Sequence, residues 1–430
     1  MSIAFFRGNR LIALLLRNAD FSVYSAGNAV SLIGMWMQRI AIGWLTWQLT
    51  ESGLWLGIVA FADFFPVLLI GPIAGAAADR WDRLRVVKTS QIIGLGQATV
   101  LFALTASGHM NIWLLVALTA FQGFVVAFNQ PARLALVPSL VAQSDLGSAV
   151  AINSVVFNLA RFIGPMFAGL AIVWSGVAAT FAVNALSYVP FLIALSRIRI
   201  ALPVTGSGKQ RSFGADLREG IRYAATHPGI AALLVLLIAL GIGGRPLNEL
   251  LPGFAADVYH SGAGGLSILA SAIGGGAILG GVWLAHRAHS SGLIVVAIGC
   301  AFVGALAAIL AIATVSMWVA VPAVAIFGFC MSSAGITTQT LIQLAAADHM
   351  RGRVMGLYGL IFRGAPAIGA LLAGVMSAHF GLRWPVFFGA VLVIAVCVWT
   401  NRSRERIALA LPTQERDAAG ASRREQLRRS

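Results

Sequence analysis

Residues 71–85 read Gly71-Pro-Ile-Ala-Gly75-Ala-Ala-Ala-Asp79-Arg80-Trp-Asp-Arg83-Leu-Arg85. A long apolar segment ends in this stretch, and a compact cluster of charges follows it directly. Because basic residues collect on one side of membrane proteins, the chain is expected to leave a membrane at this point. Gly75 would allow close helix packing, and Asp79 and Arg83 carry the charges to cap or pair helix ends. A solvated turn that only anchors the topology is the alternative.

The overall composition also indicates a membrane protein. The chain has 430 residues, of which 59% are hydrophobic and 10% charged, and its mean hydropathy is +0.86. A water-soluble core cannot hold so much apolar surface. The formal charge of +15 does not indicate nucleic-acid binding, since no soluble basic module gathers it. The three cysteines lie in apolar runs without metal-like spacing, so we expect no metal site and no cofactor.

Apolar runs near the length of one membrane crossing, about 20 residues, recur along the chain. They predict an all-α integral membrane protein with twelve transmembrane helices in two pseudo-symmetric six-helix bundles. The predicted spans are 21–49, 54–78, 89–106, 112–128, 146–173, 178–195, 230–254, 266–285, 293–314, 317–344, 354–377 and 384–400. The predicted parts are a cytoplasmic N-terminus at 1–20, a bundle at 21–198, a linker with an amphipathic helix at 199–229, a second bundle at 230–400 and a basic cytoplasmic tail at 401–430.

The distribution of basic residues predicts the orientation. Of the 30 lysine and arginine residues, 25 fall in the termini and in the loops on one side of the predicted spans. Tryptophans near the span ends mark the opposite side, as an interfacial aromatic belt does. Both termini are therefore expected in the cytoplasm, where the linker helix and the basic tail would contact membrane lipid. A tail that is merely solvated is the alternative.

Features of the first half of the chain recur loosely in the second half. Arg39 and Arg245 precede corresponding turns at similar spacing, and Arg161-Phe-Ile-Gly164-Pro165 recurs as Arg363-Gly-Ala-Pro366. Such repeats favour two parallel halves with a site between them near the middle of the membrane.

Charged residues inside the predicted spans are the main chemical clue. They are the acids Asp63 and Glu249 and the bases Arg39, Arg161, Arg245 and Arg363. Each costs roughly 2.5 to 3.5 kcal/mol at a helix centre, so each should face a cavity or pair. Arg39 and Asp63 each lie 12 residues from Glu51 and therefore at similar depth, which favours an ion pair. Arg245 and Glu249 share a helix face at i and i+4.

Two interpretations of these charges are open. Either Asp63 or Glu249 exchanges a proton while a neighbouring arginine competes for the carboxylate, or the pairs only hold helices together. Under the first interpretation, the coupling and substrate-cavity residues are Arg39, Asp63, Arg161, Arg245, Glu249, Arg363, Gln38 and Gln122.

Three motifs resemble those of major facilitator superfamily transporters. The stretch at 71–85 is similar to the loop signature between helices 2 and 3, with Asp82 where glycine is usual. The segment Gly164-Pro165-Met-Phe-Ala-Gly169 resembles part of a helix 5 motif of exporters that work by antiport. Gln122-Gly123 resembles a motif of proton-linked members, with Thr119 in place of its arginine. The resemblance implies gating roles for Gly75, Asp79, Arg80, Arg83, Gly164, Pro165 and Gly169.

Further segments resemble the branch of this superfamily that contains enterobactin exporters and macrolide-efflux-type proteins. They are Ser31-Leu-Ile-Gly-Met-Trp-Met-Gln38, Trp44-Leu-Thr-Trp-Gln-Leu-Thr-Glu-Ser52, Pro66, Asn129-Gln-Pro-Ala-Arg133 and Arg351-Gly-Arg-Val-Met355. The resemblance implies a secondary transporter of the bacterial inner membrane, working as a monomer by alternating access. Its cargo would be a siderophore, drug or similar amphipathic small molecule, exported by exchange against an ion, the proton first of all.

Two rival functions are a lipid or lysophospholipid flippase and a membrane sensor or partner-binding protein that does not transport. The intramembrane charges speak against the sensor, because such charges are costly unless they are used. No nucleotide-binding loop and no nucleophile-base pair is visible in the sequence, so we expect neither direct use of ATP nor enzymatic chemistry.

Overall fold

A computed structural model describes residues 13–198, 213–287, 292–402, 404 and 407. Every regular element in these residues is helical, so the predicted all-helical class is confirmed. Most of the predicted N-terminal segment, residues 199–212 of the linker and nearly all of the basic tail lie outside the described residues.

Ten stretches of the described residues are long and apolar enough to cross a membrane. They are Gly53–Gly71, Arg83–Ala106, Ile112–Ser139, Gln143–Arg197, Gly229–Val258, Gly262–His286, Leu293–Ala313, Met317–Ala345, Arg351–Phe380 and Arg383–Arg402. The protein is therefore a multi-pass membrane protein. Helix α2 (Ala19–Thr50) has 32 residues but is not among the ten, because polar side chains such as Asn28, Gln38 and Arg39 dilute its apolar character.

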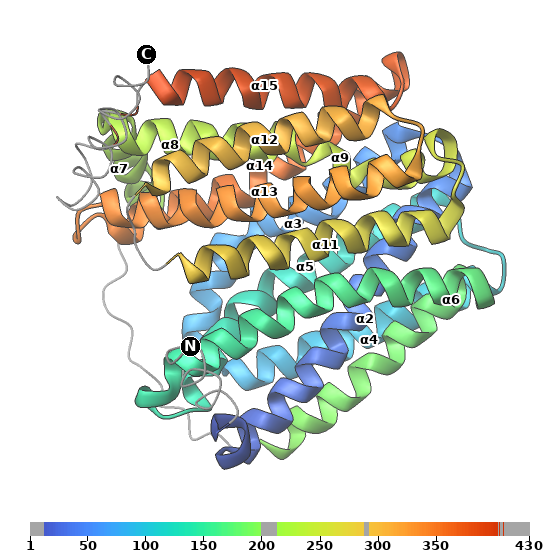
Figure 1. The fold of residues 1–430 in the computed structure, drawn as a ribbon. Coiled ribbons are helices and arrows are strands. Elements are labelled where there is room, and N and C mark those ends of the chain that lie inside the picture. Colours follow the sequence, from blue (N-terminus) through green and yellow to red (C-terminus); the bar gives the residue numbers. More distant parts are fainter. Residues whose placement is uncertain (1–12, 199–212, 288–291, 403, 405–406, 408–430) are drawn as a thin grey trace. The chain divides into compact units, whose positions relative to one another are not determined.

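The chain forms two compact units, and the first comprises residues 1–51, 62–208 and 261–271. Besides α2, its main helices are α3 (Gly53–Arg80), α4 (Arg83–Ala106), α5 (Ile112–Leu136) and α6 (Leu146–Arg197). Helix α6 packs along α2 and α4, and α4 also packs on α5 (Figure 1). Gly34 of α2 lets the backbones approach, because a Cβ there would overlap Ser187 of α6.

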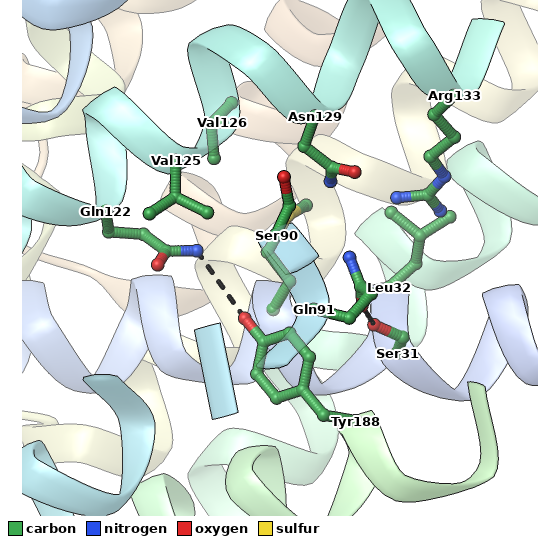
Figure 2. A pocket seen from close by; sticks show the side chains of 11 residues that line it. Ser31, Leu32, Ser90, Gln91, Gln122, Val125, Val126, Asn129, Arg133 and Tyr188 are labelled. Carbon is green, nitrogen blue, oxygen red and sulfur yellow. Dashed lines mark hydrogen bonds between the residues drawn. The ribbon is translucent and has the colours of Figure 1, made fainter. Parts of the chain in front are cut away.

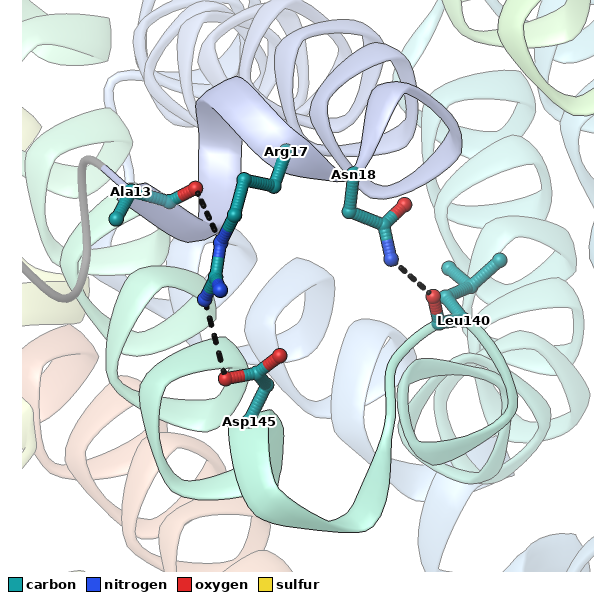
Figure 3. A network of polar contacts seen from close by, with 5 residues as sticks. All are labelled: Ala13, Arg17, Asn18, Leu140 and Asp145. Carbon is teal, nitrogen blue, oxygen red and sulfur yellow. Dashed lines mark hydrogen bonds and ion pairs between the residues drawn. The ribbon is translucent and has the colours of Figure 1, made fainter.

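The start of α2 is held to the turns that precede α6 (Figure 3). Asn18 caps α2 by accepting a hydrogen bond from the Phe21 amide at 2.9 Å. Its side-chain amide donates to the Leu140 carbonyl at 2.8 Å, and Arg17 lies 3.8 Å from the Asp145 carboxylate. Both contacts join one end of α2 to the short helices η1 (Val137–Ser139) and η2 (Gln143–Asp145) and their flanks.

Helix α6 has 52 residues and is interrupted at Gly176. There φ is 79° and ψ is 172°, a conformation that glycine adopts without strain and other residues avoid. A straight helix of this length would extend about 78 Å, well beyond a hydrocarbon core of about 30 Å. The interruption falls between the predicted spans 146–173 and 178–195.

The second unit comprises residues 52–61, 209–260 and 272–430. Its helices are α7 (Phe213–Thr226), α8 (Pro228–Ala239), α9 (Pro246–Glu249), α10 (Leu251–Gly253), α11 (Gly262–His286), α12 (Leu293–Ala313), α13 (Met317–Ala345), α14 (Arg351–Phe380) and α15 (Arg383–Arg402). Helix α12 packs against α13 and α15 around a core of small and branched residues (Figure 1).

The predicted span 230–254 lies within the apolar stretch Gly229–Val258, but its helix is not regular throughout. Between α8 and α11 the chain passes through two π-helical turns, η3 (Leu240–Gly244) and η4 (Phe254–Val258), with the short helices α9 and α10 between them. Pro246 and Pro252 lack the amide that a regular helix needs, and three glycines in η3 weaken its helical preference.

The amphipathic linker helix is present as α7, and its inner face contacts protein. Glu219 forms a 2.7 Å ion pair with Arg353 at the start of α14. The Tyr223 hydroxyl accepts a hydrogen bond from the Ala347 amide at 3.3 Å. Ile221 faces outward with 49% exposure. The helix therefore packs on α8 and α14 with one side and leaves the other side uncovered by the described residues.

Candidate functional site

The arginine of α2 and the aspartate of α3 lie together within the first unit. The Arg39 guanidinium donates to the Asp63 carboxylate at 3.2 Å, and the two side chains are 35% and 30% exposed. Their equal spacing from Glu51 predicts this pairing, and the structure confirms that the two are in contact. Its use in coupling stays a prediction.

A second arginine, Arg161, lies over the same aromatic ring as Arg39. The guanidinium carbons of Arg39 and Arg161 each lie 5.8 Å from the centre of the Trp36 ring. Arg39 also lies 5.0 Å from the Phe64 ring, and Phe157 meets Trp36 edge-on at 5.9 Å. Cations over aromatic faces are stabilised without losing their charge. Trp36 thus brings together the charges of α2, α3 and α6.

The charged residues of the second unit lie one helical turn apart, as their spacing predicts. Arg245 directly precedes α9 and Glu249 is its last residue, and both are half-buried. The Glu249 amide donates to the Arg245 carbonyl at 3.4 Å, the i, i+4 contact of a helical turn. Arg363 is half-buried in α14, next to the buried residues Gly364 to Pro366.

Gln38 lies in a seam between helices rather than at an open surface. It is 4% exposed, donates to the Gln97 carbonyl oxygen at 3.1 Å and accepts from the Asn184 amide at 2.6 Å. Gln97 donates in turn to the Leu118 carbonyl at 3.2 Å. The three amides join α2, α4 and α6, and buried amides of this kind hold membrane helices together. In this structure Gln38 is thus a packing residue.

Gln122 lines a small polar pocket in the first unit (Figure 2). Its amide donates to the Tyr188 hydroxyl at 3.5 Å, and Ser31 donates to Gln91 at 3.1 Å on another wall. The carbonyl oxygens of Gln122 and Asn129 are buried without a hydrogen-bond partner. The free volume is about 20 Å³, which holds one or two water molecules but no cargo.

The charged loop after α3 contacts the ends of two helices, α4 and α5. Asp82 caps α4 by accepting from the amides of Leu84 and Arg85 at 3.0 and 3.2 Å. This cap gives a reason for aspartate where the superfamily signature has glycine. Arg83 donates to the Ala135 carbonyl at 3.3 Å, in the last turn of α5, where a cation is favoured.

Among the other predicted gating residues, some side chains are not described, and the glycines differ in how closely they pack. The side chains of Asp79 and Arg80 lie outside the described side chains. A Cβ at Gly75 would meet no described atom within 4 Å, so the close packing predicted there is not found. At Gly164 a Cβ would lie 2.5 Å from the Trp36 Cβ.

Pro165 and Gly169 follow in the same stretch of α6. Pro165 is buried inside the helix. A Cβ added at Gly169 would overlap Ser267 of α11. The two glycines of this motif therefore give α6 its close contacts with α2 and α11, as the motif predicts for packing.

Sequence reasoning missed Trp36, Gln97, Asn184 and Tyr188 as parts of this site. Trp36 lies three residues before Arg39, one helical turn away, and that spacing was a usable signal. The amides on α4 and α6 carried no such signal, since their partners are distant in sequence. In the described residues no group of three or more His, Cys, Asp and Glu side chains could hold a metal ion.

Multiple helical spans, paired charges within them and helix-end contacts in the charged loop are the features expected of a membrane transporter. A family model described as transmembrane secretion effector matches residues 14–424. The chain belongs to this family, a branch of the major facilitator superfamily. The predicted superfamily is therefore confirmed.

Known transporters are similar to this chain over most of their length. Macrolide efflux protein A of Streptococcus pyogenes is 24% identical over 389 residues, which covers 88% of this chain and 95% of the relative. Enterobactin exporter EntS of Salmonella typhi is 27% identical over 377 residues, covering 85% and 88%. The crystal structure of the nucleoside transporter NupG is similar in fold, with a TM-score of 0.71 at 12% identity, covering 90% and 99%.

Proposed function

We propose that this protein exports an amphipathic small molecule, such as a siderophore or drug, in exchange for protons across the bacterial inner membrane. The observation that carries the proposal is the ion pair of Arg39 and Asp63 inside the spans, with Arg161 on the same tryptophan. A carboxylate held by a cation at membrane depth is costly unless it is used.

The proposed coupling step is a competition for the Asp63 carboxylate. When Asp63 is ionised, Arg39 holds it at 3.2 Å. A proton on Asp63 removes its charge and weakens the contacts that the ionised carboxylate makes with Arg39 and with hydrogen-bond donors of a cargo, so the cargo binds when the proton is absent. Cargo and proton would then bind in alternate states of the transporter, which is antiport. Glu249, half-buried beside the π-helical turns of the second unit, is the second candidate for the proton site.

We further propose twelve spans, with both termini in the cytoplasm and the protein acting as a monomer. Two facts support the count. Helix α6 is interrupted at Gly176. Helix α2 is less apolar than the ten stretches, but its 32 residues exceed the roughly 20 that one crossing needs. Two crossings for α6 and one for α2 turn the ten apolar stretches into twelve. The location of 25 of the 30 basic residues on one side supports the orientation.

The cargo class is proposed from the relatives and from the chemistry around Trp36. Macrolide efflux protein A and enterobactin exporter EntS are named for a macrolide and for enterobactin. Rings and guanidinium groups stand together near Trp36, Phe64 and Arg39, and such a mixed surface suits a molecule with both aromatic and polar parts.

The proposal is tested with Asp63→Asn and Glu249→Gln in reconstituted vesicles. Cargo is chosen by a growth screen of a deletion strain against siderophores, macrolides and dyes. We expect at least one variant to lose flux driven by a pH gradient, while exchange of labelled for unlabelled cargo continues. Asp145→Asn, at a partly exposed carboxylate just before α6, is the control. Full pH-driven flux in both variants would refute proton coupling at these residues.

The same vesicles separate the rival functions. Movement of labelled phospholipid in place of soluble cargo would indicate a flippase. Cargo binding without any flux would indicate a sensor or a partner-binding protein.

A further inference from the structure

Arg363 differs from the other arginines inside the spans. Arg39 pairs with Asp63, and Arg161 lies over Trp36. In the described part of the chain, the Arg363 side chain makes no ion pair, hydrogen bond or ring contact. It follows the start of α14 by 12 residues, about 18 Å along the helix axis, and is therefore deep within the span. An always-charged guanidinium at this depth calls for an anion.

The helix face that leads to Arg363 consists of glycines. Gly352, Gly356 and Gly359 precede Arg363 by 11, 7 and 4 residues, which places all of them on one side of α14. A Cβ added at any of the three would meet no described atom within 4 Å. None of the described residues therefore crowds this strip, which runs over about three helical turns from the first turn of α14 to the guanidinium.

Two environments fit an open strip, hydrocarbon or water. Glycine alone would be compatible with either. Arg363 decides between them, because an arginine that faced hydrocarbon so far from the helix end would be strongly disfavoured. Glycines also leave the path unobstructed, and they add no competing hydrogen-bonding side chain before the guanidinium is reached. Water along the strip, as a path that ends at the guanidinium, is therefore the environment that suits Arg363.

We propose that this path admits the anionic group of the cargo and that Arg363 binds it. The proposal rests on the proposed export function and names the cargo class: amphipathic molecules with a carboxylate, sulfonate, phosphate or similar anion. The planar guanidinium suits such groups because it can offer two parallel N–H donors to them.

The test measures the charge preference of the path with thiol reagents. In a full-length variant whose native cysteines are replaced, Gly359→Cys is treated in proteoliposomes with anionic sulfonatoethyl or cationic trimethylammonioethyl methanethiosulfonate. We expect Arg363→Gln to lower the ratio of anionic to cationic labelling rates about 10-fold, since a charged cleft concentrates ions of opposite sign. Arg363→Lys keeps the charge and should keep most of the preference.

Arg351→Gln is the matched control, because it removes the same charge from the exposed first turn of α14. It should change the ratio less than about twofold, since solvent screens an exposed charge at that distance. An introduced thiol that does not react in the Gly359→Cys variant, or a ratio that Arg363→Gln does not change, would overturn the proposal.

A second arm tests binding of an anion rather than access alone. Naphthalene-2-sulfonate should slow labelling of the Gly359→Cys variant, whereas the uncharged naphthalene-2-sulfonamide should not, and Arg363→Gln should abolish the difference. Equal protection by both probes, or none, would contradict anion binding. Neither arm needs a proton gradient or flux, so failure here is distinct from failure of proton coupling at Asp63.

Discussion

Gly169 illustrates how the absence of one carbon atom allows two helices to meet. Its position against Ser267 leaves no room for a Cβ, although the preceding part of α6 at Gly147 has open space around it. Both residues are glycines on the same helix, and only Gly169 belongs to the motif that begins at Gly164. Only the neighbour across the helix interface makes one of them indispensable.

We expect Gly169→Val to lower thermal stability by about 1–3 kcal/mol, because overpacking forces the backbones or side chains apart. The double variant Gly169→Val with Ser267→Gly should recover much of this loss. Gly147→Val serves as the control and should change stability by less than about 1 kcal/mol. Equal losses for Gly147→Val and Gly169→Val in thermal unfolding of the purified protein would contradict this account.

The charged residues show what a local pattern can predict. Spacing from Glu51 places Arg39 and Asp63 at equal depth on consecutive helices, and they meet. The pattern did not include Trp36, although the ring contacts both arginines. Aromatic residues are common in membrane spans, so a tryptophan there is noticed only when its neighbours in space are known.

Helices α2, α4 and α6 are joined by side-chain amides that are almost fully buried. Gln38, Gln97 and Asn184 are 4%, 3% and 0% exposed. Each amide uses its neighbour as a donor or acceptor, so the removal of one leaves the others unsatisfied in an apolar surrounding.

Gln38→Leu is therefore expected to cost about 1–3 kcal/mol of stability. Replacing Gln38, Gln97 and Asn184 together by leucine should cost less than the sum of the single changes, because no buried amide is then left without a partner. Thermal unfolding of the single and triple variants checks this. Additive losses would show that the three amides act independently.

Two helices change units along their length. The first turns of α3, residues 52–61, belong to the second unit, while the rest of α3 belongs to the first. Gly57 allows this, because its backbone packs against Gly374 of α14. Residues 261–271 of α11 likewise belong to the first unit, where Ser267 meets Gly169. Under the alternating-access cycle that belongs to the proposed function, such small-residue contacts would have to open.

A disulfide at one of these contacts should stop transport. A Cβ at Gly53 would lie 2.8 Å from the Ser377 Cβ, within about 1 Å of the usual spacing in a disulfide. We expect Gly53→Cys with Ser377→Cys, in a background without native cysteines, to lose flux on oxidation and regain it on reduction. Each single cysteine variant is the control. Undiminished flux in the crosslinked protein would show that α3 and α14 stay together during the cycle.

The sequence by itself determined that the chain is a helical membrane transporter, and it located most of the spans and the pairing of Arg39 with Asp63. These follow from hydropathy and from residue spacing within or between consecutive helices, which are local quantities. The π-helical turns before α11 were not predicted, since the apolar run of this span is continuous and only the pattern of hydrogen bonds reveals the turns.

The tertiary structure alone decided which polar residues within spans have polar partners and which have none among the described residues. Gln38 and Arg363 look alike in the sequence as polar residues within spans. In the fold, Gln38 is enclosed by two other amides, whereas Arg363 ends an open strip of glycines. The physical reason is that burial and hydrogen bonding depend on neighbours brought together from distant parts of the chain.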